Sequence, residues 1–136
     1  MSIQYRHEFP AAEQYFDLFS STGWNKEYGL DARDLHEAIR HSLFLVAAYD
    51  GERLIGSGRL VSDGVLHALI VDVIVLPEYQ GQGIGTAIMK QLTGFCRERR
   101  IRDVQLFCAK GKTAFYEPLG FRARPHDAPG MDLSFP

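Results

Sequence analysis

Apolar residues recur along this chain with two different periods, and the first forty residues follow the helical one. A spacing of three and four residues predicts an amphipathic helix over residues 12–19, which ends in a Ser-Ser-Thr-Gly segment. A second helix is expected to begin at a cap formed by Asp31 or Asp34 and to end near His41. Ahead of both helices, residues 3–5 predict a short edge strand.

From residue 43 onward the period is that of strands. Three segments, over residues 43–49, 54–61 and 65–76, are joined by Asp-Gly and Ser-Asp-Gly sequences that favour tight hairpins. They predict an antiparallel meander. Because the third segment is apolar on both faces, we expect helices to cover both sides of the sheet.

The remaining segments predict a strand–helix–strand unit and a short closing region. A helix runs from Gly83 to about Arg99, and a strand over residues 104–108 is expected to lie parallel to the third strand after a right-handed crossover. A short helix over residues 112–117, which stops at Gly120, completes this region. We expect closing strands around Phe121 and over residues 131–135.

Together these elements predict one α/β domain over residues 1–136, with a central mixed sheet flanked by helices on both faces. The formal net charge of -2 argues against nucleic acid or an anionic membrane as a partner, because both require a cationic surface. No apolar run reaches the roughly 20 residues that span a bilayer, and the N-terminus does not resemble a signal peptide. Cys96 and Cys108 have apolar neighbours, so we expect buried, reduced thiols and a cytoplasmic location.

The segment LIVDVIVLPEYQGQGIGT, residues 69–86, carries the strongest functional signal. An apolar strand stops at Pro77, three alternating glycines follow, and a helix begins at once. The first N–H groups of a helix have no intrahelical acceptor and lie at the positive end of its dipole. Glycine also lets an anion approach the main chain closely. The segment therefore predicts a site for a phosphorylated cofactor.

Two common phosphate-binding patterns do not match. A dinucleotide-binding fingerprint needs a third glycine where Thr86 stands, and residues 77–80 separate the strand from the first glycine. A P-loop is suggested by the Gly-Lys-Thr at residues 111–113, but it needs a glycine where Leu106 stands.

A third pattern matches. The sequence QGQGIG at residues 80–85 resembles the Q/R-x-x-G-x-G/A motif of the GCN5-related N-acetyltransferases, and FYEPLGF at residues 115–121 resembles their second motif, F-Y-x-x-x-G-F. One helix and one strand separate the two, as in that family. The resemblance covers residues 43–121. It implies the GNAT acyl-CoA N-acyltransferase fold, acetyl-CoA as cosubstrate and no metal.

The resemblance also implies which residues hold acetyl-CoA. The pantetheine arm would pair with the backbone of the strand before the turn, at Val73, Ile74 and Val75. Many members carry an asparagine shortly before the second motif where this chain has Ala109, so that contact is absent or supplied elsewhere. The diphosphate would lie on the amides of the turn, formed by Gln80, Gly81, Gln82, Gly83, Ile84, Gly85 and Thr86.

The implied reaction is attack of a primary amine on a thioester through a tetrahedral intermediate. A backbone N–H at a strand bulge, expected near Ile74–Val75, would stabilise the oxyanion. Tyr116 matches the tyrosine that protonates the leaving thiolate. Asp72 is the candidate base because a carboxylate inside an apolar strand is costly to bury without a partner or a function. It could equally accept hydrogen bonds from loop amides or from an arginine, with His67 or a water relay as the base.

The acceptor is open at this stage. Trp24 and Tyr28 lie in an aromatic loop that either lines the substrate pocket or packs the loop onto the core. A small-molecule amine is the main expectation, and a protein or peptide amine is an alternative. The region around Asp72 is also similar to glucosamine-6-phosphate N-acetyltransferases, for which Arg33, Arg53 or Arg59 could bind the phosphate, whereas Glu27, Asp31 and Asp34 would favour a cationic amine.

A non-catalytic acyl-CoA-binding module is the rival function, and the presence of Tyr116 argues against it. Small domains of this family commonly form homodimers, so the resemblance leaves a homodimer open.

Overall fold

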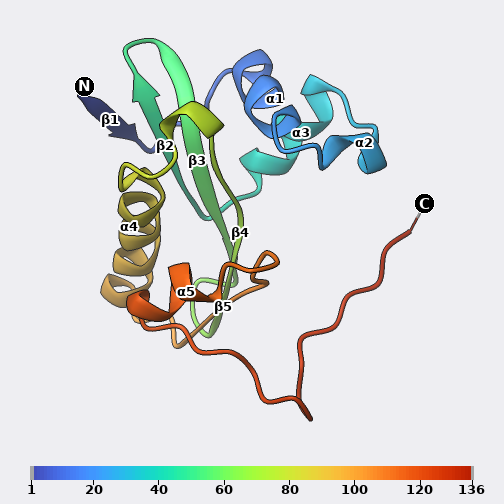
Figure 1. Ribbon diagram of the computed structural model, residues 1–136, viewed down its shortest axis with the longest axis vertical. Coiled ribbons are helices and arrows are strands. Elements are labelled where there is room, and N and C mark those ends of the chain that lie inside the picture. The colour runs from blue at the N-terminus through green and yellow to red at the C-terminus, as the bar shows by residue number, and fades with distance from the viewer. Residues whose placement is uncertain (1, 136) are drawn as a thin grey trace. The chain divides into compact units, whose positions relative to one another are not determined.

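The computed structural model describes residues 2–135 of the chain (Figure 1). They group into two compact units, which divide after Gln105. Within the described part, no helix is both long and apolar enough to cross a membrane. A single domain over residues 1–136 remains a prediction.

Five strands form one sheet in the order β1-β2-β3-β4-β5, with neighbours in sequence lying side by side. The first four pair antiparallel, which confirms the predicted meander and places the first strand at an edge. Their bounds are β1 Ile3–Arg6, β2 Phe44–Asp50, β3 Arg53–Ser62, β4 His67–Val75 and β5 Asp103–Leu106.

The last strand is shorter than the predicted one, because β5 ends at Leu106 and the next two residues leave the sheet. Phe107 is 62% exposed, and Cys108 is exposed too. The expectation that both cysteines are buried is therefore wrong for Cys108 and confirmed for Cys96, which lies on the buried face of the helix over residues 84–98.

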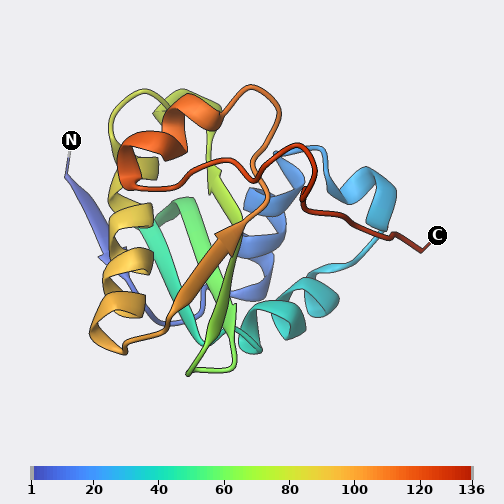
Figure 2. The same ribbon diagram turned by 90° about the horizontal axis from the view of Figure 1, so that it is seen from below.

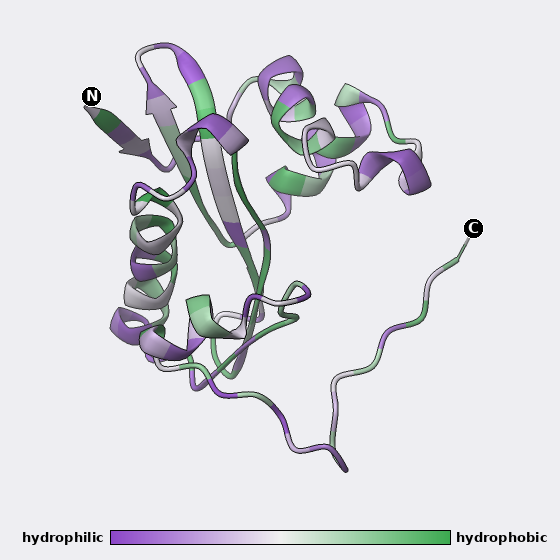
Figure 3. Cartoon of the chain, viewed as in Figure 1, coloured by the Kyte–Doolittle hydropathy of each residue, from purple (hydrophilic) through white to green (hydrophobic). Residues whose placement is uncertain are grey.

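Helices cover both faces of the sheet in the first unit, as the two-sided apolar pattern of β4 predicts. Figure 2 shows α4 on one face and α1 and α3 on the other. Hydrophobic residues concentrate on the strands and on the helix faces turned toward them (Figure 3). The helices are α1 Ala12–Ser20, α2 Asn25–Tyr28, α3 Ala32–Arg40 and α4 Ile84–Glu98.

The start of α3 follows from a reciprocal cap. The N–H of Asp34 donates to Asp31 Oδ1 at 2.9 Å, and the N–H of Asp31 donates to Asp34 Oδ2 at 3.1 Å. This capping box satisfies two otherwise unpaired amides, so the helix begins at Ala32. The predicted cap is confirmed, and both candidate residues take part in it.

The pairing of β3 with β4 contains a bulge. Ser57 faces Ile74 and Arg59 faces Val71, so the single residue Gly58 lies opposite both Asp72 and Val73. The bulge predicted near Ile74–Val75 is thus two residues too late in the chain. Residue 58 is a glycine in a crowded place, since a Cβ there would lie 2.7 Å from Ile88 Cγ2 of α4.

Within this bulge, the backbone of Asp72 is left-handed, with a φ of 54°. Aspartate is one of the few residues other than glycine that adopt this conformation readily. Bulges re-aim side chains, and they occur often beside active sites. Here the bulge directs Asp72 out of the regular alternation of β4.

The second unit contains α5 (Thr113–Tyr116), followed by the 3-10 turn η2 (Glu117–Leu119). This helical segment ends at Gly120, which has a left-handed φ of 100°. The predicted short helix and its glycine stop are confirmed. The predicted closing strands are wrong, because residues 121–135 contain no strand. Residues 131–135 alternate as a strand would, but no described strand pairs with them, and Met131 and Phe135 are more than 80% exposed.

Candidate functional site

The glycine turn, residues 80–86, connects β4 to α4 through the 3-10 turn η1 (Pro77–Tyr79). Gly81 and Gly83 have left-handed φ values of 78° and 83°, and Gly83 is the N-cap of α4. A Cβ on either glycine would meet no described atom within 4 Å, so this side of the turn is open. Because the first amides of the 15-residue helix α4 have no intrahelical acceptor, the turn has the properties of an anion site.

The two glutamine side chains of the turn donate hydrogen bonds to backbone carbonyls shortly before it. Gln80 Nε2 donates to the Val75 carbonyl at 2.9 Å, and Gln82 Nε2 donates to the Glu78 carbonyl at 3.4 Å. These residues therefore leave mainly their backbone amides for a ligand. On the strand side, Ile74 is buried whereas Val73 and Val75 are half-buried.

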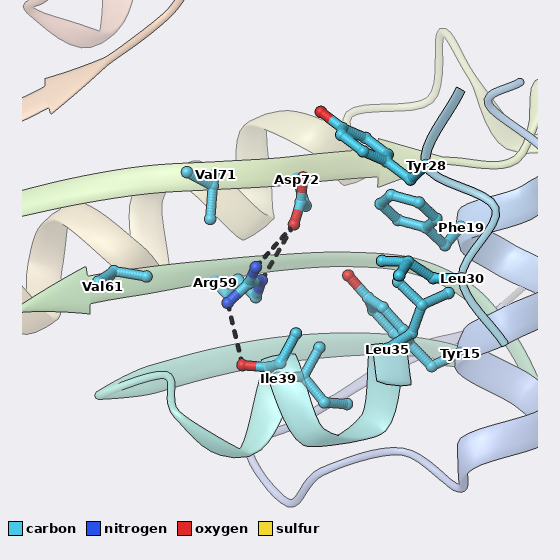
Figure 4. A pocket seen from close by; sticks show the side chains of 11 residues that line it. Tyr15, Phe19, Tyr28, Leu30, Leu35, Ile39, Arg59, Val61, Val71 and Asp72 are labelled. Carbon is cyan, nitrogen blue, oxygen red and sulfur yellow. Dashed lines mark hydrogen bonds and ion pairs between the residues drawn. The ribbon is translucent and has the colours of Figure 1, made fainter. Parts of the chain in front are cut away.

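A cavity of about 300 Å³ lies on the face of the sheet opposite α4, between the strands and the helices α1–α3 (Figure 4). We name it the aromatic pocket, because Tyr15, Phe19 and Tyr28 form much of its wall together with aliphatic side chains. Its charged lining residues are Arg59 from β3 and Asp72 from the bulge of β4. The strand β4 thus contributes Asp72 to the pocket and ends three residues later at Val75, from where the chain continues toward the glycine turn.

Arg59 and Asp72 form an ion pair that is largely shielded from water. Nε and Nη2 of Arg59 each lie 3.0 Å from Asp72 Oδ2, with side-chain exposures of 15% and 24%. Nη1 of Arg59 donates to the Ala38 carbonyl and to Ser42 Oγ, both at 3.3 Å, which ties the pair to the end of α3. Across residues 2–135, no hydrogen bond engages Oδ1 of Asp72. Asp72 is therefore an acceptor for an arginine and still has one free oxygen.

Tyr15 is a site residue that the sequence did not distinguish from the core. Its side chain is 1% exposed to bulk water, yet it lines the pocket with its hydroxyl turned toward Arg59 and Asp72 (Figure 4). Burial, and then the negative charge of Asp72, raise the pKa of Tyr15 well above that of a free phenol. The hydroxyl thus stays protonated and can donate a hydrogen bond.

The two aromatic residues of the predicted substrate loop lie differently. Tyr28 lines the pocket and is 64% exposed, so it stands at the mouth. Trp24 is not among the lining residues, and its ring packs edge-on against Phe19 at a centroid distance of 5.8 Å. The contact favours the interpretation that Trp24 packs the loop onto the core.

His67, the second candidate base, lies outside the pocket lining. Its Nδ1 is 3.1 Å from Asp103 Oδ2, and both side chains are largely exposed. Within residues 2–135, no group of three or more potential metal-ligating side chains occurs.

Tyr116 ends α5 in the second unit and stands between two aromatic rings. The Phe115 and Phe121 centroids lie 4.9 Å and 6.2 Å from its own, both in edge-on contacts. Burial raises the pKa of Tyr116 above 10.0, and the charge that the Cys108 thiol can carry raises it further. The phenol is therefore protonated at neutral pH, as a proton donor must be.

Comparison with known proteins supports one family. The sequence model of the acetyltransferase (GNAT) family matches residues 9–121. The chain is 42% identical over 87 residues to GCN5-related N-acetyltransferase 2, chloroplastic, of Arabidopsis thaliana. These aligned residues cover 60% of this chain and 34% of that protein. It is 32% identical over 118 residues to the uncharacterized N-acetyltransferase ycf52 of Porphyra purpurea, covering 84% of this chain and 66% of that protein.

The chain thus spans between about a third and two thirds of these relatives. Among solved structures, a GNAT family acetyltransferase of Streptococcus pneumoniae superposes with a TM-score of 0.82 at 33% identity, covering 98% of each chain. The match extends through both sequence motifs and the mixed sheet with its flanking helices. The chain therefore belongs to the acetyltransferase (GNAT) family, a family of acetyl-CoA-dependent N-acetyltransferases.

Proposed function

We propose that this chain transfers the acetyl group of acetyl-CoA to the primary amine of a small molecule. The observation that carries the proposal is the glycine turn, where two left-handed glycines leave an open face at the N-terminus of α4. Such a site suits the diphosphate of coenzyme A. Family membership supports the same donor.

In the proposed arrangement the donor uses main chain and the acceptor uses the aromatic pocket. The diphosphate binds the amides of residues 80–86, and the pantetheine arm follows the backbone of residues 73–75. The amine enters the aromatic pocket, where the free Oδ1 of Asp72 and the Tyr15 hydroxyl offer hydrogen-bonding partners.

The reaction needs two proton movements. The amine nitrogen forms a bond to the thioester carbon, the C–S bond breaks, and the electron pair leaves on sulfur. Asp72, directly or through water, takes the proton that the amine loses, and Tyr116 gives a proton to the thiolate. A phenol with a raised pKa is a suitable acid for this step because it remains protonated until it is needed.

The charges of the pocket favour an acceptor with an uncharged and largely apolar body. Arg59 is the cation among the described lining residues, and it is already paired with Asp72. A phosphosugar would find no unpaired cation there. Glu27, Asp31 and Asp34 lie outside the lining, and the last two satisfy each other in the α3 cap, so a polycationic amine is not favoured either.

Thiol release from acetyl-CoA tests the proposal. The assay compares a panel of primary amines of differing body charge in the wild type and in Tyr116→Phe. We expect amine-dependent release, fastest with apolar amines, and a large loss in the variant. Coenzyme A binding without any amine-dependent release would instead establish an acyl-CoA-binding module. Release only with peptide amines would replace the small-molecule acceptor.

The free state of both cysteines supports a proposed location in a reducing compartment such as the cytoplasm. A homodimer remains a proposal from the family resemblance.

A further inference from the structure

The segment that leads into the glycine turn is held by residues outside the acetyltransferase motif. Tyr79, the last residue of η1, donates its hydroxyl to Asp50 Oδ2 at 2.5 Å. Asp50 ends β2 at the hairpin to β3, so the contact joins two loops that are 29 positions apart in sequence. Hydrogen bonds of this length between a hydroxyl and a carboxylate are among the stronger ones in proteins.

A second contact joins the same two loops. Arg53, the first residue of β3, lies with Nη2 3.4 Å from Glu78 Oε2 and with its guanidinium 5.9 Å from the centre of the Tyr79 ring. Two consecutive residues of η1 are therefore fixed to the β2–β3 hairpin. The Arg53–Glu78 pair is exposed and contributes little by itself, so the Tyr79–Asp50 bond is the main link.

The residues that follow make two side-chain hydrogen bonds, from Gln80 to the Val75 carbonyl and from Gln82 to the Glu78 carbonyl, and both acceptors lie ahead of the turn. Gly81 and Gly83 have nothing within 4 Å of an added Cβ in the described structure, and glycine has the greatest backbone freedom of all residues. Amides bind an anion well only where their directions are set in advance. The position of these amides therefore depends in part on the residues that lead into the turn, of which Tyr79 is the one fixed to the β2–β3 hairpin by the hydrogen bond to Asp50.

We propose that Tyr79 and Asp50 are a positioning pair that fixes the glycine turn for the diphosphate of the donor. The proposal rests on the proposed function, since it assumes that the diphosphate binds this turn. Neither side chain needs to touch the donor. Loss of the bond releases the entry to the turn and weakens the binding of its phosphates, while the thioester and the acceptor are affected little.

Two donors separate this role from a general contribution to folding. Acetyl-CoA carries the diphosphate, whereas S-acetylpantetheine has the same thioester and arm without any phosphate. In Tyr79→Phe we expect the KM of acetyl-CoA to rise about ten-fold, the equivalent of losing about 1.4 kcal/mol of binding. The KM of S-acetylpantetheine and the kcat with either donor should change less than two-fold.

Asp50→Ala provides a second route to the same result because alanine has no acceptor for the Tyr79 hydroxyl. The double variant should be no worse than either single one, because both substitutions remove the same interaction. Tyr5→Phe is the matched control, since Tyr5 lies on the edge strand and its hydroxyl has no hydrogen-bond partner in the described chain. An equal rise of KM for both donors, or no rise for either, would overturn the proposal.

Binding measurements separate the test of the positioning pair from the test of the acetyltransferase activity. Calorimetry with coenzyme A and with pantetheine needs no turnover, so it reports on the turn even in a chain that acetylates no amine. Wild-type binding of coenzyme A without amine-dependent thiol release would refute the acetyltransferase proposal alone. Unchanged coenzyme A affinity in both Tyr79→Phe and Asp50→Ala would refute the positioning pair alone.

Discussion

Replacing Arg59 by methionine tests how much the ion pair in the aromatic pocket contributes to the fold. Methionine keeps the length of the side chain but removes two contacts of 3.0 Å to Asp72 and two of 3.3 Å to the end of α3. Breaking a fully buried pair costs about 3–5 kcal/mol. Because the two side chains are 15% and 24% exposed, water recovers part of this, and we expect a loss of about 2 kcal/mol.

The measurement is urea unfolding at neutral pH for Arg59→Met, Asp72→Asn and the double variant. The coupling energy of the cycle isolates the pair from other effects of each substitution. The exposed pair Arg40–Glu37, with one contact of 2.8 Å on the surface of α3, is the control. Arg40→Met should cost no more than about 0.5 kcal/mol, since exposed pairs are screened by solvent.

A coupling energy for Arg59 and Asp72 as small as that of the exposed pair would refute the reasoning. It would mean that water reaches the pocket freely and that the apparent shielding of the pair has no energetic effect. A large coupling together with full activity in Arg59→Met would retain the structural role and remove Arg59 from the acceptor site.

Three further substitutions test the proposed chemistry. Tyr116→Phe should lower kcat about 100-fold, as expected for loss of a general acid, with little change in the KM of the amine. Because burial raises the pKa of Tyr116 above that of a free phenol, rate–pH profiles of the wild type should show no decline from this group near neutral pH. Gly83→Ala should weaken coenzyme A binding in calorimetry and cost about 1 kcal/mol of stability from strain at its left-handed φ of 83°. Tyr28→Ala should raise the KM of the amine more than Trp24→Ala does, since only Tyr28 is among the pocket-lining residues; the reverse order would move the acceptor away from this pocket.

Features set by nearby residues could be predicted from the sequence. The cap of α3 needs Asp31 and Asp34 three positions apart, and the hairpins need glycine in their turns. The glycine turn is equally local, because a strand, alternating glycines and a helix follow one another without interruption. In each case the physical cause lies within about ten residues of its effect.

Features set by distant contacts could not be predicted. The bulge lies opposite Gly58, where a Cβ would come within 2.7 Å of Ile88 Cγ2 of α4, a residue 30 positions away. The bulge in turn directs the Asp72 side chain toward Arg59, with which it forms the ion pair. The Tyr15 hydroxyl has no signal in the sequence, because a buried tyrosine in an amphipathic helix looks like any other core residue.

The error at residues 131–135 has the same origin. Alternation of apolar and polar residues shows that a segment can form a strand, but the strand itself consists of hydrogen bonds to a neighbour. The described chain offers Met131, Leu133 and Phe135 no such neighbour, and all three are more than 75% exposed.

The two interpretations of Asp72, as a structural acceptor and as a base, are compatible in this geometry. Arg59 binds only Oδ2, through two nitrogens, and the left-handed backbone at residue 72 turns the carboxylate into the pocket. A single fixed oxygen orients the group, because rotation about the Cβ–Cγ bond would break the pair. Both Asp72 and Tyr15 line the pocket, and no hydrogen bond within residues 2–135 engages Oδ1. The ion pair therefore contributes to the proposed chemistry by fixing the direction of the free oxygen, and a carboxylate without Arg59 would lack that constraint.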